Sequence, residues 1–168
     1  MGDYDQDNVI IGVGKIEVNG VSLGYTSGGV ALINTADRMD KEVDQSYAAV
    51  GIHKIRETFE IRTNLAEDTL DNLKIVWEQT ESVVTASPTR TLSWGMNPDV
   101  VEYSLKFYGK SPEGNDREFS VHKAVIWESG ELNHSRDALS VIPVTFRVLP
   151  DTDLSAGKEY GVIIDTIA

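Results

Sequence analysis

The side chains that come closest to a known chemical pattern are the acidic residues at positions 3–8, DYDQDN. Aspartates at alternate positions open the calcium-binding loop of EF-hands, in which a glycine stands at the sixth position and a bidentate glutamate at the twelfth. The corresponding positions of this chain hold Asn8 and Gly14. Because neither residue suits its position, the pattern predicts a solvated acidic segment and no calcium site.

Other residues that catalyse reactions or bind metals are few and widely spaced. The chain has no cysteine, and no two of its histidines, His53, His122 and His134, have the i, i+4 spacing of a helical metal site. It has no G-x-S-x-G nucleophile motif, and GVGKIEVNG lacks the third glycine of a phosphate-binding turn. We therefore expect no metal, no cofactor and no catalytic residue, with a carboxylate site assembled by the fold as a distant alternative.

Composition argues against binding to nucleic acid and against insertion into membranes. Fifteen Lys and Arg residues against 27 Asp and Glu residues give a net charge of −12, whereas binding to phosphate backbones needs the opposite sign. An acidic surface is still compatible with DNA that slides past without binding. No apolar run approaches the ~20 residues of a membrane span, and the N-terminus lacks the pattern of a signal peptide. We expect a chain that is soluble and intracellular at synthesis.

The first third of the chain predicts a hairpin followed by a long loop. Between residues 14 and 24, alternating apolar positions flank Asn19-Gly20, which favours a type I′ hairpin because both turn residues need positive φ. Residues 34–47, NTADRMDKEVDQSY, are charged and have almost no periodicity. They predict a polar loop, and a loop of this length in a compact domain is usually functional or disordered.

One segment has a helical period. Ala66, Leu70, Leu73 and Trp77 fall on one helical face at spacings of four, three and four. With Asn64 as a cap for the first turn, the pattern predicts a helix over about residues 65–79. Its apolar stripe should lie against a sheet.

The rest of the chain predicts strands at 52–61, 101–107, 119–127 and 142–148, with Pro143 favouring an edge strand or a bulge. Residues 151–168 predict a C-terminal strand or an arm. The fold class is therefore mainly β: a single domain, residues 1–168, forming an antiparallel β-sandwich or barrel of about six to eight strands with one flanking helix. The aromatic residues expected in its core are Phe59, Tyr103, Phe107, Phe119, Trp127 and Phe146.

Four stretches follow one another in a characteristic order: GKIEVNGVSLGYTSGGVAL, a polar segment ending near KEVDQ, TNLAEDTLDNLKIVW, and IPVTFRVLPDTDLSAGKEYGVIID. Their order and spacing, over roughly residues 12–165, resemble the major tail tube proteins of long-tailed bacteriophages. Tube proteins of contractile tails and type VI secretion systems are similar in fold, so the resemblance does not decide between these machines.

The resemblance implies a structural virion protein with no cofactor, located in the tail and assembled in the cytoplasm of the bacterial host. Six copies would join their sheets into a ring, and stacked rings would form a hollow tube through which DNA is ejected without specific binding. Further implied partners are tail terminator and baseplate or tail-tip proteins, and the tape measure protein in the lumen. Contacts between rings or subunits are expected at the polar segment, namely at Asp37, Arg38, Asp40, Lys41, Glu42, Asp44 and Gln45.

Two further segments are second candidates for contacts between subunits: an N-terminal arm, residues 1–10, and GVIIDTIA at the end of the chain. A lumen lined by carboxylates would keep DNA moving by like-charge repulsion. The main alternative, from another class, is a small soluble β-sandwich module that binds carbohydrate or peptide. Self-association separates the two functions, because a binding module has no reason to form rings or tubes.

Overall fold

The structure is a computed structural model that describes residues 15–45, 47–132 and 140–167. Strands make up 54% of the described residues and helix 5%, which confirms the mainly β class. The elements in chain order are β1 (Lys15–Val18), β2 (Val21–Ser22), β3 (Thr26–Lys41), β4 (Gly51–Leu65), α1 (Leu70–Val76), β5 (Val84–Ala86), β6 (Thr89–Thr91), β7 (Tyr103–Lys110), β8 (Asp116–Ser129), β9 (Ile142–Leu149) and β10 (Gly161–Asp165).

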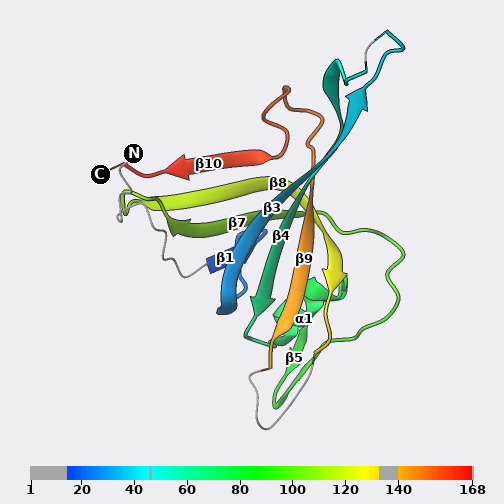
Figure 1. The fold of residues 1–168 in the computed structure, drawn as a ribbon. Helices are drawn as coiled ribbons and strands as arrows, with labels where there is room; N and C mark the ends of the chain where they lie inside the picture. Colours follow the sequence, from blue (N-terminus) through cyan, green and yellow to red (C-terminus); the bar gives the residue numbers. More distant parts are fainter. Residues whose placement is uncertain (1–14, 46, 133–139, 168) are drawn as a thin grey trace.

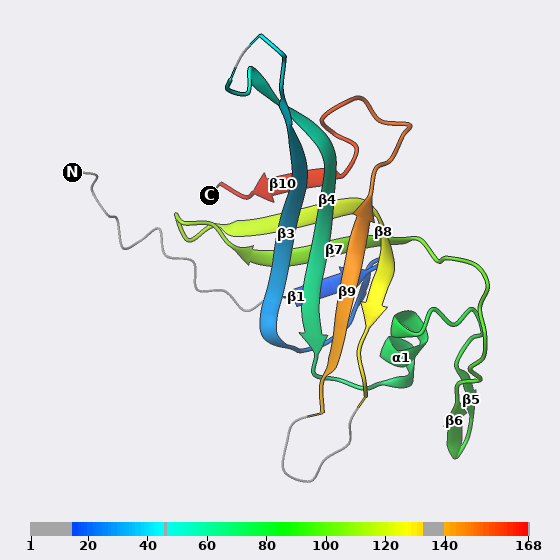
Figure 2. The same ribbon diagram turned by 45° about the vertical axis from the view of Figure 1, so that its right-hand side comes forward.

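Eight of the strands form one antiparallel sheet that folds over on itself. The strand order is β2-β1-β7-β8-β9-β4-β3, and β10 also pairs with β8. Residues 117–121 of β8 pair with β10, whereas residues 123–129 pair with β9. Strands β9, β4 and β3 therefore leave the plane of β10 and form a second layer, which crosses the layer of β1, β7 and β10 steeply (Figures 1 and 2). The result is a β-sandwich-like body.

The core lies between the two layers, where alternate residues of each strand point inward. Strand β7 shows the pattern clearly, since Tyr103, Leu105 and Phe107 are buried while Ser104 and Lys106 are exposed. The largest fully buried side chains come from both layers, from α1 and from the connection between β2 and β3: Phe146, Ile16, Leu23, Ile61, Leu65, Leu105, Ile142, Val18, Val76 and Val144.

The predicted first hairpin is confirmed. Asn19 and Gly20 have φ values of 50° and 79°, as a type I′ turn requires, and they join β1 to β2. The side chain of Asn19 also accepts a hydrogen bond from the backbone N–H of Ser104 at 2.8 Å. This bond ties the turn to β7, so the hairpin is held by the body as well as by its own turn.

The helix is shorter than predicted. Residues 64–65 are the end of β4, because Leu65 is fully buried and pairs with Ile142 of β9. The helix begins only after Thr69, whose hydroxyl accepts a hydrogen bond from the Asn72 N–H at 3.2 Å. Tertiary burial of the strand thus outweighs the local helical pattern of residues 65–69. The predicted cap at Asn64 is wrong.

Helix α1 closes one end of the sandwich. Leu73 and Val76 enter the core, while Leu70 and Trp77 pack against it at partial exposure. The hydroxyl of Tyr103 donates to the carbonyl of Ile75 at 3.3 Å, and burial raises the pKa of Tyr103 to about 12. This tyrosine is therefore a protonated donor at any physiological pH, and it fixes the helix to β7.

Two details of the predicted strands are wrong. Pro143 does not mark an edge, since β9 lies between β8 and β4. It is the second residue of β9, before the pairing with β8 begins at Val144, and its carbonyl accepts from the Gly130 N–H at 2.7 Å. Trp127 is 52% exposed instead of buried.

The exposure of Trp127 follows from an irregularity in β8. Leu105 and Tyr103, two positions apart on β7, pair with Val121 and Ala124, three positions apart on β8. The extra residue reverses which side chains of β8 face inward. Ala124 and Ile126 therefore face the core. The ring of Trp127 lies outside and stacks on the guanidinium of Arg147, whose Cζ atom is 3.2 Å from the centroid of the ring.

The C-terminal segment is a strand of the body through residue 165. Strand β10 pairs with residues 117–121 of β8, and Gly161 at its start has no room for a side chain, since a Cβ there would lie 2.2 Å from the Ser120 carbonyl oxygen. The predicted N-terminal arm, residues 1–10, lies outside the described residues.

Candidate assembly surface

Strands β3 and β4 run on together beyond the body as a two-stranded ribbon, which we define as residues 34–57 (Figures 1 and 2). The prediction of a loop at residues 34–47 is therefore wrong for its first part. Residues 34–41 belong to β3 and pair with β4 as far as Lys41 and Gly51, so that the connecting loop is residues 42–50. These strand residues lack apolar alternation because no core lies on either side of them.

Within the described ranges, no third strand supports the ribbon. Strand β9 pairs with β4 only from Phe59 to Leu65, and β3 pairs only with β4. Residues 52–56 are all exposed, as are residues 37–41. A two-stranded hairpin without a packed face is at best marginally stable in water. The ribbon is thus held by its continuity with the body and offers both of its faces to another molecule.

A β-bulge lies in the middle of the ribbon. Asp37 pairs with Arg56 and Arg38 with Lys54, which leaves Ile55 as the extra residue of β4. A bulge increases the local twist and makes further edge pairing harder. The bulge also bends β4, so the outer part of the ribbon runs in a different direction from the inner part.

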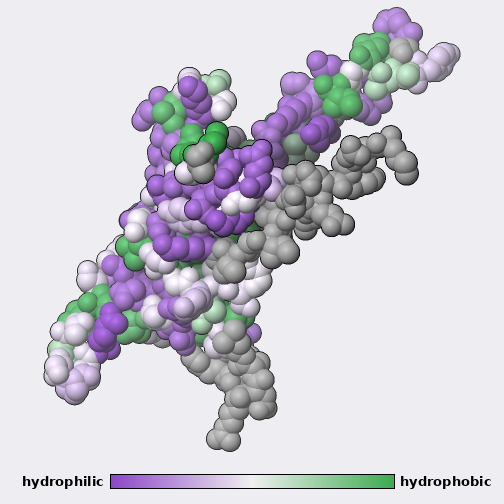
Figure 3. Space-filling view, turned by 90° about the vertical axis from the view of Figure 1, so that its left-hand side faces the viewer, coloured by the Kyte–Doolittle hydropathy of each residue, from purple (hydrophilic) through white to green (hydrophobic). Residues whose placement is uncertain are grey.

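The ribbon carries large apolar side chains that the chain itself does not cover. Burying one such side chain contributes roughly 1.5–3 kcal/mol of favourable free energy. A partner that covered several of them would therefore gain several kcal/mol toward binding. Figure 3 shows hydrophobic groups interspersed with hydrophilic ones along this projection, at the upper right of the view. The exposed apolar residues are Met39, Val43, Tyr47, Val50, Ile52 and Ile55.

The structure brings all of the predicted contact residues onto this one projection. Asp37, Arg38, Asp40 and Lys41 lie on β3 and are exposed, whereas Glu42, Asp44 and Gln45 are exposed in the connecting loop. The sequence did not predict that the second strand of the ribbon, β4, adds Lys54, Arg56 and Glu57 to this surface. This was missed because residues 52–61 have the alternation of an ordinary body strand.

The charges of the ribbon nearly balance. Residues 34–57 hold four Lys and Arg against five Asp and Glu, a net charge of −1 in a chain of −12. Lys54 binds Glu57 at 2.6 Å, and the amide of Asn34 donates to the same carboxylate at 3.1 Å. These contacts, the first more than the second, lower the pKa of Glu57. A balanced surface of both signs can dock on a copy of itself without long-range repulsion.

Besides the two-residue strand β2, two longer strands of the main sheet have a free outer edge among the described elements. The outer edge of β3 has no partner strand among the described elements, and neither does the outer edge of β10. Beside that second edge, Val162, Ile163 and Ile164 are exposed. Exposed edges with apolar side chains invite pairing with other chains.

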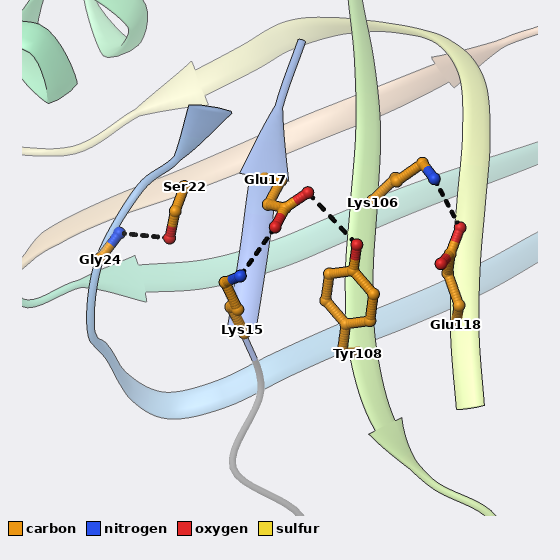
Figure 4. Close-up of polar contacts among 7 residues, drawn as sticks. All are labelled: Lys15, Glu17, Ser22, Gly24, Lys106, Tyr108 and Glu118. Atoms are coloured by element: carbon orange, nitrogen blue, oxygen red, sulfur yellow. Dashed lines mark hydrogen bonds and ion pairs between the residues drawn. The ribbon is translucent and has the colours of Figure 1, made fainter. Parts of the chain in front are cut away.

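The outward face of β1, β7 and β8 carries paired charges (Figure 4). Lys15 binds Glu17 at 2.8 Å, and the hydroxyl of Tyr108 donates to the same carboxylate at 3.2 Å. Lys106 binds Glu118 at 2.8 Å. The hydrogen bond from Lys15 lowers the pKa of Glu17, and the bond to Glu118 raises the pKa of Lys106. Both groups therefore stay charged and paired near neutral pH.

A similar group lies on the outward face of the other layer. Glu60 accepts from Arg62 at 2.8 Å and from Arg147 at 2.9 Å, and the two arginines lower its pKa, Arg147 more than Arg62. Paired charges of this kind suit a polar surface and cross-strand stabilisation.

The remaining candidates for chemistry do not converge. His53 is exposed on the ribbon and His122 is half-buried on β8, whereas His134 and the acidic residues 3–8 lie outside the described residues. In the part of the chain that the structure describes, there is no group of three or more His, Cys, Asp or Glu residues placed to hold a metal ion. None of its described helices is long and apolar enough to cross a membrane.

No protein-family model matches this sequence, and no curated protein is significantly similar to it.

Proposed function

We propose that this chain is a structural protein whose copies assemble with one another through the ribbon. The observation that carries the proposal is the length of β3 and β4 that continues past the body with both faces exposed. A domain that acted alone would gain nothing from such an extension, which exposes apolar side chains and adds little stability.

The assembly that fits best is the tube of a phage tail, as the order of the sequence motifs suggests. A ring of six copies would pair the free sheet edges of neighbouring subunits, and closure would remove the aggregation hazard that those edges create. The ribbon projects away from the body and would contact the adjacent ring. Its charge balance supports stacking, since a chain with a net charge of −12 otherwise repels its copies.

In such a tube the lumen would conduct DNA without binding it. The paired charges on the two outward sheet faces support this role, because Lys15, Lys106 and Arg147 are each bound to a carboxylate of the same face. Proteins that terminate the tube, form its tip, or occupy its lumen before ejection would be the other partners.

The proposal is tested by electron microscopy of the purified chain in negative stain, after concentration and incubation, with the molar mass measured by light scattering. We expect rings or hollow tubes and a mass that is a multiple of the single chain. A chain that stays monomeric at every concentration would contradict the proposal. The next experiment would then be a screen of glycans and peptides, which tests the alternative of a binding module.

A further inference from the structure

A largely apolar groove runs between the edge of β3 and the layer of β7, β8 and β10. It consists of two adjoining hollows of about 130 and 310 Å³ that share Leu32, Phe107 and Phe119 as lining residues. The rings of Phe107 and Phe119 stack at 4.4 Å and form its floor. The smaller hollow ends at Val162 and Ile163 of β10.

The groove lies where the two layers separate. β10 continues one layer, while β9, β4 and β3 turn away from it, so the side chains between these strands have no partner strand above them. Leu32 and Ile163, on either side, are both exposed. An extended segment lying there would cover these apolar side chains.

The other end of the groove lies where the described chain begins. The larger hollow is lined by Tyr108, Gly109 and Lys110 of β7. Lys15, the first residue of β1, pairs with Tyr108. Lys15 itself therefore lies beside this end of the groove.

The residues that precede Lys15 have the composition to fill it. Residues 9–13 read VIIGV, an apolar run between the acidic residues 3–7 and β1. Extended chain covers ~3.3–3.6 Å per residue, so six residues from position 14 back to position 9 can reach roughly 20 Å. That is the length of an ordinary strand.

We propose that residues 9–13 dock in this groove of their own chain, with Ile10 and Ile11 against Leu32, Phe119 and Ile163. Attachment at Lys15 keeps the segment at a high effective concentration beside the groove, which favours it over the same segment of a second copy. The docked segment covers the apolar side chains between the layers. This inference is independent of tube formation and concerns the single chain.

A disulfide in the cysteine-free chain tests the docking directly. In the double variant Ile11→Cys, Leu32→Cys, we expect mild oxidation of dilute protein to give an internal disulfide in most molecules, seen as a faster monomer band on non-reducing gels. The matched control is Ile11→Cys, Ser82→Cys, whose second position is exposed beyond α1 and should keep free thiols. Disulfide geometry needs Cα atoms within ~7 Å, so chance contact alone gives little product.

Two outcomes would overturn the proposal. One is the absence of the internal disulfide, or equal yield in the control. The other is a covalent dimer at the same dilution, which would place the segment of a second copy in the groove.

A second variant keeps the test valid if the cysteine variants fold poorly. Ile10→Asp, Ile11→Asp should release the segment and raise the fluorescence of a hydrophobic dye such as ANS several-fold, with the far-UV circular dichroism unchanged. The control Asp3→Asn, Asp5→Asn changes two charges that precede the segment in the sequence and leaves residues 9–13 unchanged. Equal dye fluorescence in the Asp variant and the wild-type chain would contradict docking.

Discussion

The two halves of the β3–β4 hairpin contain the same two strands in different surroundings. In the half that belongs to the body, Ile61 is fully buried, and β4 is paired on both sides, with β3 and with β9. In the ribbon, Ile52 of the same strand is 67% exposed and β4 has β3 alone. Backbone pairing between the two strands runs through both halves, interrupted only by the bulge at Ile55 in the ribbon and by a second irregularity at Gly28 and Gly29 in the body.

The comparison shows that strand pairing and burial are separate requirements. The body half meets both and supplies the stability of the domain. The ribbon half meets only the first, so its side chains do not contribute to folding through burial and are available for contacts with another chain. Matched substitutions in the two halves test this division.

The largest difference is expected between two isoleucines of β4. Ile61→Ala should lower the free energy of unfolding by about 2–5 kcal/mol, since it leaves a cavity in the core. Ile52→Ala should change it by no more than about 0.5 kcal/mol, as at other exposed sites. Chemical denaturation followed by circular dichroism measures both. Equal losses would show that the ribbon is part of the folding core.

A smaller difference is expected between two asparagines. Asn72 is buried in α1, and its amide donates to the carbonyls of Leu23 at 3.0 Å and Glu67 at 2.9 Å. Asn72→Ala leaves these carbonyls without a donor and should cost about 1–3 kcal/mol. Asn34→Ala, at an exposed position of the ribbon, should cost well under 1 kcal/mol. Thermal melts of both variants compare them, and a larger loss for Asn34→Ala would refute the division.

The smallest difference concerns the pH dependence of two glutamates. The folded state lowers the pKa of Glu60, so its contribution is complete above the pKa of the unfolded chain and is lost as pH falls through the folded value. At pH 7, Glu60→Gln should therefore be less stable than the wild-type chain by about 1 kcal/mol, allowing for solvent screening. This gap should narrow as the pH falls below the ordinary pKa of a glutamate, and it should close only below the lowered pKa of the folded state.

Glu57→Gln in the ribbon provides the matched control. The pKa of Glu57 is also lowered, by Lys54 and Asn34, so the sign of its pH dependence is the same. Its pairing is more exposed to solvent, with 28% of its side chain accessible against 17% for Glu60, and the effect should be smaller. Denaturation at pH 7, 5 and 3 measures both, and a larger effect at Glu57 would contradict the ranking.

Much of the fold could be predicted from the sequence because local chemistry decides it. Asn19-Gly20 specifies its turn through the backbone conformations that these residues tolerate. Alternation along β7 specifies a half-buried strand. In both cases the deciding signal lies within a few neighbouring residues.

The features that were missed depend on distant residues. The outward position of Trp127 follows from one extra residue in β8 opposite β7, which no local pattern reveals. Pro143 lies inside the sheet because the pairing of β9 with β8 begins after it. The start of α1 is set by the burial of Leu65 in the core.

The candidate site was only half predictable for a related reason. Its charged residues on β3 and in the loop stood out in the sequence, yet their strand conformation did not, because a ribbon in solvent has no apolar face to produce alternation. The residues that pair with them, Lys54 and Arg56, were hidden in a strand that runs from the core into solvent.

The most direct test of the account removes the outer part of the ribbon, residues 40–52, and leaves the body. Replacing residues 40–52 by Asn-Gly would join Met39 to His53, which already pair, through a two-residue turn. We predict that the free energy of unfolding of this variant lies within about 1 kcal/mol of that of the wild-type chain. We also predict that its light-scattering mass stays that of a monomer under conditions in which the wild-type chain assembles. A variant that assembled to the same mass as the wild-type chain would contradict the central claim that the ribbon is the assembly surface.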